Sequence, residues 1–285
     1  MPDLISKIED ILQTTIVKHQ SVGGGCIAQT QVIKTDDGHN YFLKAGFNNS
    51  MFRNEANGLK ELSKAGCIRI PKVLAVGDDF LLLENIEQGS KSKHFFDDFG
   101  KAFAQMHRFT SDNFGFYEDN FIGSTPQLNI PETSESTNWT NFYFNKRLKY
   151  QFLLCEKNGY SDEGFKRLFA GIEKNISHIL SGSKEAPSLL HGDLWGGNYM
   201  VDTNHKAVLI DPGVYYGHRE ADLAMTKLFG GFSPQFYQSY NQTYPLKEGY
   251  EYRQNIYLLY HVLNHLNLFG YSYKSQAEQL MRSYL

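Results

Sequence analysis

Two aspartates and an asparagine in the second half of the chain have the spacing of a phosphoryl-transfer site. The stretch His191-Gly-Asp-Leu-Trp-Gly-Gly-Asn198 places Asp193 and Asn198 five residues apart, and Asp211 follows Asp193 by 18 residues. In the kinase pattern H-R-D-x-x-x-x-N, the Asp accepts the proton of the substrate hydroxyl, while the Asn and a later Asp bind metal ions. The spacing therefore predicts Asp193 as the catalytic base and Asn198 and Asp211 as Mg²⁺ ligands.

Phosphoryl transfer also requires a cation that neutralises the charge of the phosphates. Lys44 ends the apolar stretch 41–43, where an ammonium group is costly without anionic partners; a lysine that emerges into water at a strand end is the alternative. Glu55 and Glu61 lie on the next predicted helix, about 240° apart around its axis. Glu55 lies beside the apolar residues that must face inward and Glu61 lies away from them, so we expect Glu55 to pair with Lys44.

Three consecutive glycines, Gly23, Gly24 and Gly25, precede the first predicted hairpin, where a loop covering the phosphates would lie. Backbone N–H groups can approach phosphate oxygens closely where no Cβ atom intervenes, although a plain turn explains three glycines equally well. A positive field there would lower the pKa of Cys26. A redox-responsive thiol, and through it a disulfide-linked dimer instead of a monomer, is one hypothesis for Cys26; a small packed side chain is the other.

The chain is expected to divide near residue 87 into two lobes, residues 1–87 and 88–285, in an α+β arrangement with a cleft between them. The first lobe is predicted to be a sheet crossed by one important helix. Its strands are expected over 27–35, 41–44, 70–76 and 80–83, and its helices over 1–16 and 51–65. Where the lobes join, backbone groups from Glu84 to Ile86 are expected to hydrogen-bond a purine edge, unless this is an ordinary linker.

The second lobe is predicted to be mainly helical around a catalytic hairpin at residues 189–211. Helices are expected over 95–109, 139–154 and 163–180, and a polar surface loop over 121–138. Asp211-Pro212-Gly213 stands where protein kinases have Asp-Phe-Gly, and a proline restricts φ to near −65°. We therefore expect an Asp211 that moves little, in a permanently assembled kinase for small molecules.

Composition and charge exclude several other classes of protein. The 285 residues carry a formal net charge of −3, which gives no electrostatic case for binding nucleic acid or an anionic membrane. Three cysteines are too few for a disulfide framework or a zinc knuckle. Residues 1–16 lack the features of a signal peptide, and no apolar run approaches the roughly 20 residues of a membrane span. We expect a cytoplasmic protein.

Two histidines on one predicted helix have the spacing of a zinc pair. His261 and His265 are four residues apart, but the Glu of the metalloprotease motif does not follow the first of them. Packing or a hydrogen bond to substrate is the expected role, and we assign His265 to the substrate side.

Four stretches of the chain resemble the fructosamine kinase (ketosamine 3-kinase) family. They are residues 188–198, 210–224, 228–232 and 260–270. The similarity covers nearly the whole chain, and Leu-Trp-Gly-Gly within the catalytic loop is specific to this family. Aminoglycoside phosphotransferases and choline kinases share His-Gly-Asp but generally not Trp195-Gly-Gly.

The resemblance implies a bilobal protein-kinase-like fold of the aminoglycoside phosphotransferase type, with ATP and Mg²⁺. The family phosphorylates the 3-hydroxyl of ketosamines, the adducts of sugars with amines or protein lysines, and the unstable 3-phosphate then releases the sugar. By resemblance, Trp195 lies against the sugar or flanks the base, and Asp222 supports the catalytic loop, together with His191. The roles of Asp193, Asn198, Asp211, Lys44 and Glu55 are the same as those that their spacing predicts.

Two departures from the family pattern leave the preferred sugar open. Gly213 stands where an Ala is usual, and residues 130–138 are inserted before Trp139, in a loop expected to border the acceptor site. Ribulosamine, fructosamine and erythrulosamine, free or protein-bound, all remain candidates. The alternative functions are another small-hydroxyl kinase of the same type and a nucleotide-binding pseudokinase.

Overall fold

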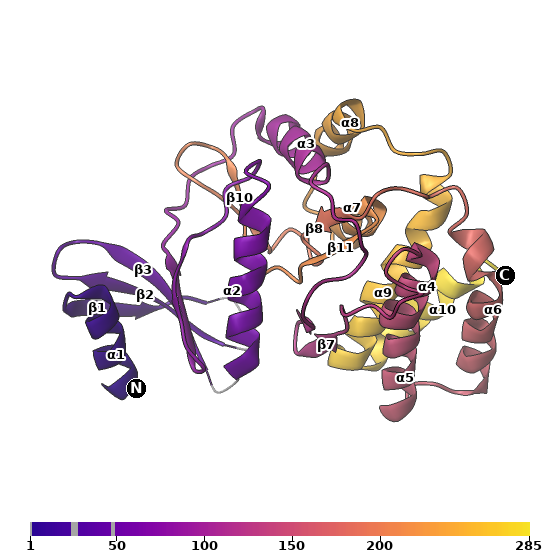
Figure 1. Cartoon of the computed structure of the whole chain (residues 1–285), viewed down its shortest axis with the longest axis horizontal. Coiled ribbons are helices and arrows are strands. Elements are labelled where there is room, and N and C mark those ends of the chain that lie inside the picture. The colour runs from indigo at the N-terminus through magenta and orange to yellow at the C-terminus, as the bar shows by residue number, and fades with distance from the viewer. Residues whose placement is uncertain (1, 24–27, 47–48) are drawn as a thin grey trace.

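The computed structural model describes residues 2–23, 28–46 and 49–285 and has a sheet-based lobe and a larger helical lobe (Figure 1). The small lobe contains a five-stranded antiparallel sheet in the order β1-β2-β3-β5-β4. Its strands are β1 Ile16–Ser21, β2 Gln29–Thr35, β3 Asn40–Ala45, β4 Val73–Val76 and β5 Phe80–Glu84. Two helices accompany it, α1 Pro2–Leu12 and α2 Asn49–Ser63.

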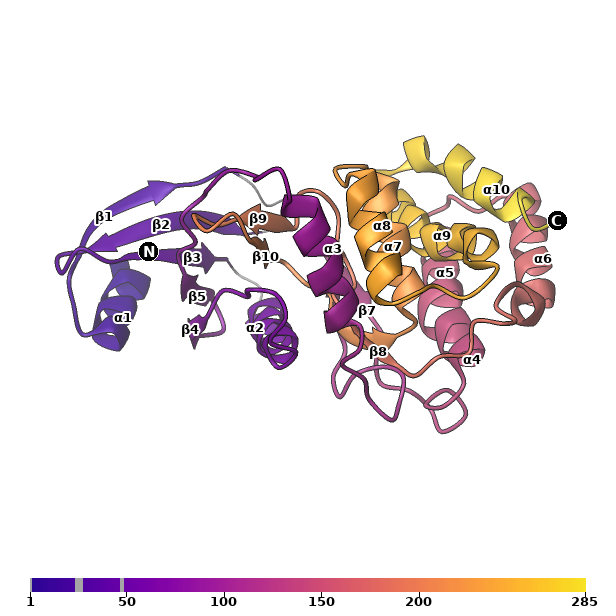
Figure 2. The ribbon, with the colours of Figure 1, turned by 90° about the horizontal axis from the view of Figure 1, so that it is seen from above.

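The two faces of this sheet are covered by different helices. Leu43 and Leu82 pack with Ile8 of α1, whereas Leu81 packs with residues of α2. Side chains alternate between the faces of a strand, so Lys44, next to Leu43, projects toward α2. The pleat of β3 therefore decides that the lysine faces the helix that carries Glu55. Both views place α2 between the sheet and the helical lobe (Figures 1 and 2).

The prediction of one helix over residues 1–16 was wrong at its end. The helix stops at Leu12, and residues 16–21 form β1, which pairs with β2 along its length. Most side chains of β1 are exposed, since it lies at the edge of the sheet. An edge strand held by backbone pairing lacks the alternating apolar pattern that identifies strands from sequence.

The large lobe consists of helices packed around α9, with three short hairpin-like strand pairs. Its helices are α3 Phe95–Met106, α4 Trp139–Tyr143, α5 Tyr150–Lys157, α6 Glu163–Ile179, α7 Arg219–Leu228, α8 Pro234–Thr243, α9 Tyr250–Phe269 and α10 Lys274–Arg282. A π-helix, Phe144–Lys149, joins α4 to α5, and a 3₁₀-helix, Tyr271–Tyr273, precedes α10. The strand pairs are β6 Asn120–Ile122 with β7 Thr125–Gln127, β8 Ser188–Leu190 with β11 Tyr215–Gly217, and β9 Tyr199–Val201 with β10 Ala207–Leu209.

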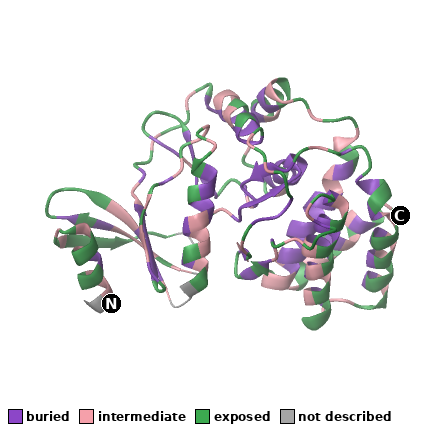
Figure 3. Ribbon diagram, in the orientation of Figure 1, coloured by how far each residue is buried: buried purple, intermediate pink, exposed green. Residues whose placement is uncertain are grey.

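The most deeply buried part of this lobe surrounds the catalytic segment. Buried residues gather around α7, β8 and β11 (Figure 3), and α7 is buried from Arg219 to Thr226. Helix α9 buries side chains around most of its circumference, as expected for a central helix. In the part of the chain that the structure describes, no helix is both long and apolar enough to cross a membrane.

The predicted surface loop over 121–138 is partly buried, contrary to expectation. Its first part forms the β6–β7 hairpin, and its next part is held by Arg147 of the π-helix. The Arg147 guanidinium lies 4.0 Å from the Tyr215 ring centroid, and its Nη2 donates to Asn129 Oδ1 at 2.7 Å. Asn129 is therefore buried as a hydrogen-bond partner of Arg147, whereas Glu132, Thr133 and Ser134 face solvent. Sequence composition alone does not distinguish these two kinds of polar residue.

A buried histidine on α9 makes the stability of the protein depend on pH. Burial, followed by the nearby His265, lowers the pKa of His261 to about 3, against about 6.5 for an unfolded histidine. Below pH 6.5 this histidine binds a proton in the unfolded state but stays neutral in the folded state, so acidification favours unfolding. We expect His261 alone to cost about 2 kcal/mol between pH 6.5 and 5.

Urea unfolding at pH 7 and pH 5 measures this effect. His261 Nδ1 has no hydrogen-bond partner among the described residues, so His261→Leu removes the titration without breaking a bond at that atom. The variant should lose about 2 kcal/mol less than the wild type on acidification. His178→Gln, at an exposed position, should lose as much as the wild type. Equal losses in the wild type and His261→Leu would contradict the prediction.

Candidate active site

The loop between β8 and β9 carries the predicted base and one predicted metal ligand. Asn198 is buried, and its Nδ2 donates to Asp193 O at 2.8 Å and to Asp193 Oδ2 at 3.2 Å. These bonds fix the side-chain amide so that its Oδ1 remains available to a cation. The structure therefore brings Asp193 and Asn198 into direct contact.

A glycine allows this loop to lie against the segment that carries Asp211. Gly192 has φ +82°, and a Cβ atom there would lie 1.9 Å from Gly213 O. Gly213 N donates to His191 O at 2.9 Å, and His191 Nε2 contacts Ile210 O at 3.0 Å. Only glycine fits this approach, which explains why Gly192 stands where the kinase pattern has Arg.

Asp222, in the first turn of α7, supports the catalytic loop through hydrogen bonds to its backbone. Its two oxygens accept the backbone N–H groups of His191 at 2.7 Å and Gly192 at 2.8 Å. Burial by itself raises the pKa of Asp222, but bonds and charges from His107, His191 and Gly192 outweigh it and keep the pKa below its usual value. The carboxylate is thus held ionised as the support of the loop.

His107 is a member of this group that sequence reasoning did not single out. Its Nε2 lies 3.2 Å from Asp222 Oδ2, and its Nδ1 lies 2.7 Å from Tyr240 Oη. Burial lowers the pKa of His107 despite the nearby carboxylate. The only signal in the sequence was its place on the apolar face of the predicted helix 95–109, which also fits a packed core histidine.

Lys44 joins the two lobes at the centre of the site. Its Nζ donates to Glu55 Oε1 at 2.7 Å and also to the carboxylate of Asp211. Burial alone lowers the pKa of Lys44, but the charges of Glu55 and Asp211 outweigh it and raise the pKa. The structure therefore brings together the lysine, its predicted glutamate and the predicted metal-binding aspartate.

The oxygen donors at this point suit a hard divalent cation. Burial, and then the charge of Asp211, raise the pKa of Asp193 well above its usual value. Asp211 keeps 44% of its side chain exposed and adopts φ +54°, a left-handed conformation that Asp tolerates better than most residues. A carboxylate beside an amide oxygen is a donor set that Mg²⁺ accepts, and the ion's charge would offset the repulsion between Asp193 and Asp211.

Helix α2 is bound to the large lobe along the face opposite the sheet. Tyr216 Oη donates to Glu61 Oε1 at 2.8 Å, and Asn57 Nδ2 donates to Glu118 Oε1 at 3.0 Å. A Cβ atom on Gly58 would lie 3.4 Å from the Pro212 ring. Glu61 therefore lies away from the stripe that meets the sheet, as expected, but it is buried, because the large lobe covers the face that the sheet leaves free.

The two glutamates of α2 should respond differently to the same substitution. Glu55→Gln removes a charge from the Lys44 pair, and we expect kcat/KM for ATP to fall about 10- to 100-fold. Glu61→Gln removes the negative charge that bonds Tyr216 and Lys64 but keeps one acceptor oxygen, and we expect a loss of about 1 kcal/mol of stability with kcat nearly unchanged. Steady-state kinetics and urea unfolding of both variants test this, and a larger kinetic loss in Glu61→Gln would reverse the assignment.

Aromatic side chains lie beside the catalytic loop. The Trp195 ring covers Gly197, where a Cβ atom would lie 2.4 Å from it. Its centroid is 6.0 Å from that of Phe229, which in turn is 4.9 Å from the ring of His265. The structure therefore links the two residues predicted for the substrate, Trp195 and His265, through Phe229. His265 Nδ1 lies 2.7 Å from His261 O, which leaves Nε2 as the nitrogen able to meet a ligand.

The remaining residues predicted to contact the nucleotide are Glu84 and Ile86, where the lobes join, and the three glycines that precede β2. The Glu84 carboxylate accepts hydrogen bonds from Arg69 Nη2 at 2.6 Å and Lys72 N at 3.2 Å. The backbone N–H of Glu84 donates to Lys72 O at 2.9 Å, which leaves its carbonyl oxygen as the group that can meet a purine. Ile86 is buried nearby in sequence. Gly23 is exposed, whereas Gly24, Gly25 and Cys26 lie outside the described residues.

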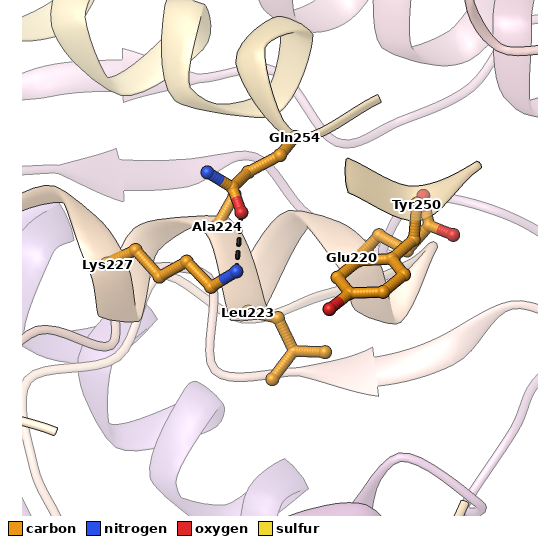
Figure 4. A pocket seen from close by; sticks show the side chains of 6 residues that line it. All are labelled: Glu220, Leu223, Ala224, Lys227, Tyr250 and Gln254. Atoms are coloured by element: carbon orange, nitrogen blue, oxygen red, sulfur yellow. Dashed lines mark hydrogen bonds between the residues drawn. The ribbon is translucent and has the colours of Figure 1, made fainter. Parts of the chain in front are cut away.

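Two hollows occur elsewhere on the large lobe. A cavity of about 10 Å³ between α7 and α9 is bordered by a hydrogen bond from Lys227 to Gln254 (Figure 4). This volume accommodates about one water molecule. A more open hollow of about 680 Å³ lies between His178 at the end of α6 and Tyr252 at the start of α9. Neither is lined by the residues that meet at Lys44.

The inserted segment 130–138 is bonded to other parts of the large lobe. Glu135 accepts a hydrogen bond from Asn145 Nδ2 at 2.9 Å and forms an ion pair with Lys146 at 3.3 Å. Phe114 N donates a hydrogen bond to Ser136 O. These contacts join the insertion to residues near α4 and the π-helix.

Comparisons with known proteins agree with the arrangement of this site. The chain matches the family model described as fructosamine kinase over residues 3–285. It is 40% identical over 281 residues to the chloroplastic protein-ribulosamine 3-kinase of Arabidopsis thaliana, with 95% of this chain and 84% of that protein covered. A Thermobifida fusca YX-ER1 crystal structure, assigned as a fructosamine-3-kinase, has a TM-score of 0.90 at 29% identity, covering 100% of this chain and 99% of that one.

A more distant structure bears on the fold alone. An ADP-bound aminoglycoside phosphotransferase has a TM-score of 0.65 at 15% identity, with 99% of each chain covered. The predicted bilobal, protein-kinase-like α+β fold is thereby confirmed, with a β-rich small lobe and a helical large lobe.

Proposed function

Because this chain belongs to the fructosamine kinase family, we propose that it is an ATP-dependent kinase that phosphorylates the 3-hydroxyl of ketosamines. The observation that carries this proposal is the meeting of Lys44 from the small lobe with Asp211 from the large one, beside the Asp193–Asn198 pair. The family is described as fructosamine kinase and the plant relative is a protein-ribulosamine 3-kinase, and both sugar adducts are ketosamines. The chemical class of the acceptor follows from these names, and the preferred sugar does not.

The residues of the site divide the work of phosphoryl transfer between the lobes. Lys44, held by Glu55, neutralises phosphate oxygens of ATP, and residues 1–87 form the lobe that covers the nucleotide. Asn198 and Asp211 are the residues that would hold Mg²⁺, which when bound would neutralise charge on the phosphates. The carbonyl oxygen of Glu84 and backbone groups of Ile86 are proposed to bind the purine. Gly23, Gly24 and Gly25 are proposed to bind the phosphates, although the last two lie outside the described residues.

Residues 88–285 form the lobe that binds the acceptor and deprotonates it. The acceptor O3 lies at Asp193, which receives its proton as the bond from O3 to the γ-phosphorus forms. The bond from that phosphorus to the β,γ-bridging oxygen breaks, and ADP departs. Trp195 and His265 contact the sugar. His191 and Asp222 position Asp193 through the backbone of the loop, as their hydrogen bonds indicate.

The expected outcome in the cell is deglycation. Resemblance to the family implies that a ketosamine 3-phosphate is unstable and that loss of the sugar restores the amine. We propose that the protein acts in the cytoplasm, where Mg²⁺ and ATP are plentiful, on free ketosamines or on glycated lysines of proteins.

Product identification tests the proposed function directly. The protein is incubated with ATP, Mg²⁺ and a synthetic ribulosamine or fructosamine, and ³¹P–¹H correlation NMR identifies the carbon that receives the phosphate. We expect phosphate on the 3-oxygen and one ADP for each sugar phosphorylated. Transfer only to a different small alcohol would show another kinase of this fold, and tight ATP binding without turnover would show a pseudokinase; either result would overturn the proposal.

A further inference from the structure

Five aromatic side chains form a continuous row that begins at the catalytic loop. Ring centroids are 6.0 Å apart for Trp195 and Phe229, 4.9 Å for Phe229 and His265, and 5.4 Å for His265 and Phe269. The ring of Tyr273 completes the row, 5.2 Å from His265. We call these five residues the aromatic row. It runs from the loop after β8 to the C-terminal end of α9.

The row is exposed where core aromatic residues would be covered. Trp195 is 39% exposed, Phe229 44% and Phe269 56%. Contiguous exposed apolar side chains on a soluble domain commonly mark a binding surface. Other exposed rings of this lobe occur in isolated pairs, such as Tyr271 with Tyr160 and Tyr252 with Tyr284. The aromatic row therefore differs from ordinary surface aromatics in its length and in its contact with the catalytic loop.

The covalent structure of a ketosamine limits how far its amine nitrogen can lie from the reacting O3. Four bonds separate O3 from the amine nitrogen, so the nitrogen lies within about 5 Å of O3. With O3 at Asp193, the substituent on this nitrogen must continue away from the reacting atoms, and Trp195, two residues along the loop from Asp193, begins a surface on which it can lie. The aromatic row is the surface that extends from Trp195.

The chemistry of the row suits an alkylammonium group that carries a hydrocarbon chain. Aromatic faces attract cations and offer apolar contact to methylene or aryl groups. Burial lowers the pKa of His265, so that imidazole is neutral at neutral pH and does not repel an ammonium. None of the five side chains then carries a charge.

We infer that Phe229, Phe269 and Tyr273 of the aromatic row form the subsite for the amine substituent of the ketosamine, next to the sugar contacts of Trp195 and His265. This subsite selects adducts of amines bearing an aliphatic or aromatic chain. This inference rests on the proposed function. It assigns Phe229, Phe269 and Tyr273 to substrate selection, and it makes the amine, as well as the sugar, a determinant of KM.

Two substrates that share one sugar separate the amine subsite from the rest of the site. Fructosamines of methylamine and of hexylamine present the same O3 and the same nitrogen but differ in chain length. For the wild type we expect a KM about tenfold lower for the hexylamine adduct, with similar kcat. Phe269→Ala should raise KM for the hexylamine adduct about five- to tenfold and leave KM for the methylamine adduct within twofold. Phe269→Tyr, which keeps the ring, should behave as the wild type.

A matched control is available on the same helix. Tyr252 is 48% exposed at the first turn of α9, about 25 Å from Phe269 along the helix axis. Tyr252→Ala should leave both KM values unchanged. Equal KM values of the wild type for the two adducts, or an equal rise for both in Phe269→Ala, would overturn the role of the row alone. Turnover neither of these adducts nor of the ribulosamines and erythrulosamines of the same two amines would overturn the proposed function and the role of the row with it.

Discussion

Replacing Asp193 by Asn is expected to lower kcat about 100- to 10,000-fold while the affinity for ATP stays nearly unchanged. An amide cannot accept the proton of the 3-hydroxyl, whereas its size preserves the neighbouring contacts. The backbone oxygen of residue 193, which accepts Asn198 Nδ2 at 2.8 Å, is unaffected by the substitution. Steady-state kinetics with a ketosamine and calorimetric titration with ATP measure the two quantities separately.

Asp202 provides the matched control for this substitution. It is also a buried carboxylate of the large lobe, but it accepts Arg69 Nη1 at 2.8 Å and backbone N–H groups of its own turn. Asp202→Asn should reduce stability and change kcat by no more than a few fold. If Asp193→Asn retained more than a few percent of wild-type kcat, the base would have to be reassigned.

Replacing Asp211 by Asn is expected to have the second-largest effect, with a fall in kcat of at least about 100-fold. The substitution removes an anionic oxygen from Mg²⁺ and one of the two carboxylates that bond Lys44. Asn tolerates the φ of +54° at this position, so the backbone should keep its path. The weaker ligand should also raise the Mg²⁺ concentration needed for half-maximal activity.

A magnesium titration at saturating ATP measures this second effect, and thermal melting checks that the variant is folded. Excess Mg²⁺ should recover only part of the lost activity, because the charge next to Lys44 remains altered. An unchanged Mg²⁺ requirement together with a normal kcat would show that Asp211 does not bind the metal ion.

The contact between Lys44 and Glu55 could be predicted from sequence because it depends on local rules. Strand alternation sends Lys44 to the face opposite Leu43, and the apolar stripe of α2 carries Glu55 toward the same face. The same wheel placed Glu61 on the opposite face but did not reveal that this face is buried as well. A helical wheel identifies the side that faces one partner, and α2 has two, the sheet and the large lobe.

The parts that sequence did not reveal depend on partners distant in the chain. Arg147 forms a hydrogen bond with Asn129 in the segment 128–129. Asp222 forms a hydrogen bond with His107, which follows α3 and lies more than 100 residues earlier in the chain. In the sequence, a polar residue with such a buried partner looks the same as a polar residue that faces water. The motif predicted which residues form the site, whereas the buried groups that position it became visible only in the structure.

The central claim is that Asn198, Asp211 and Lys44 bind one nucleoside triphosphate and its metal ion, with Asp193 facing the acceptor. A crystal structure with Mn²⁺ and a non-hydrolysable ATP analogue tests it, since anomalous scattering locates the metal. The account predicts manganese about 2.2 Å from Asn198 Oδ1 and from an Asp211 oxygen, with Lys44 Nζ against the phosphates. Manganese and phosphates bound away from these three residues would contradict it.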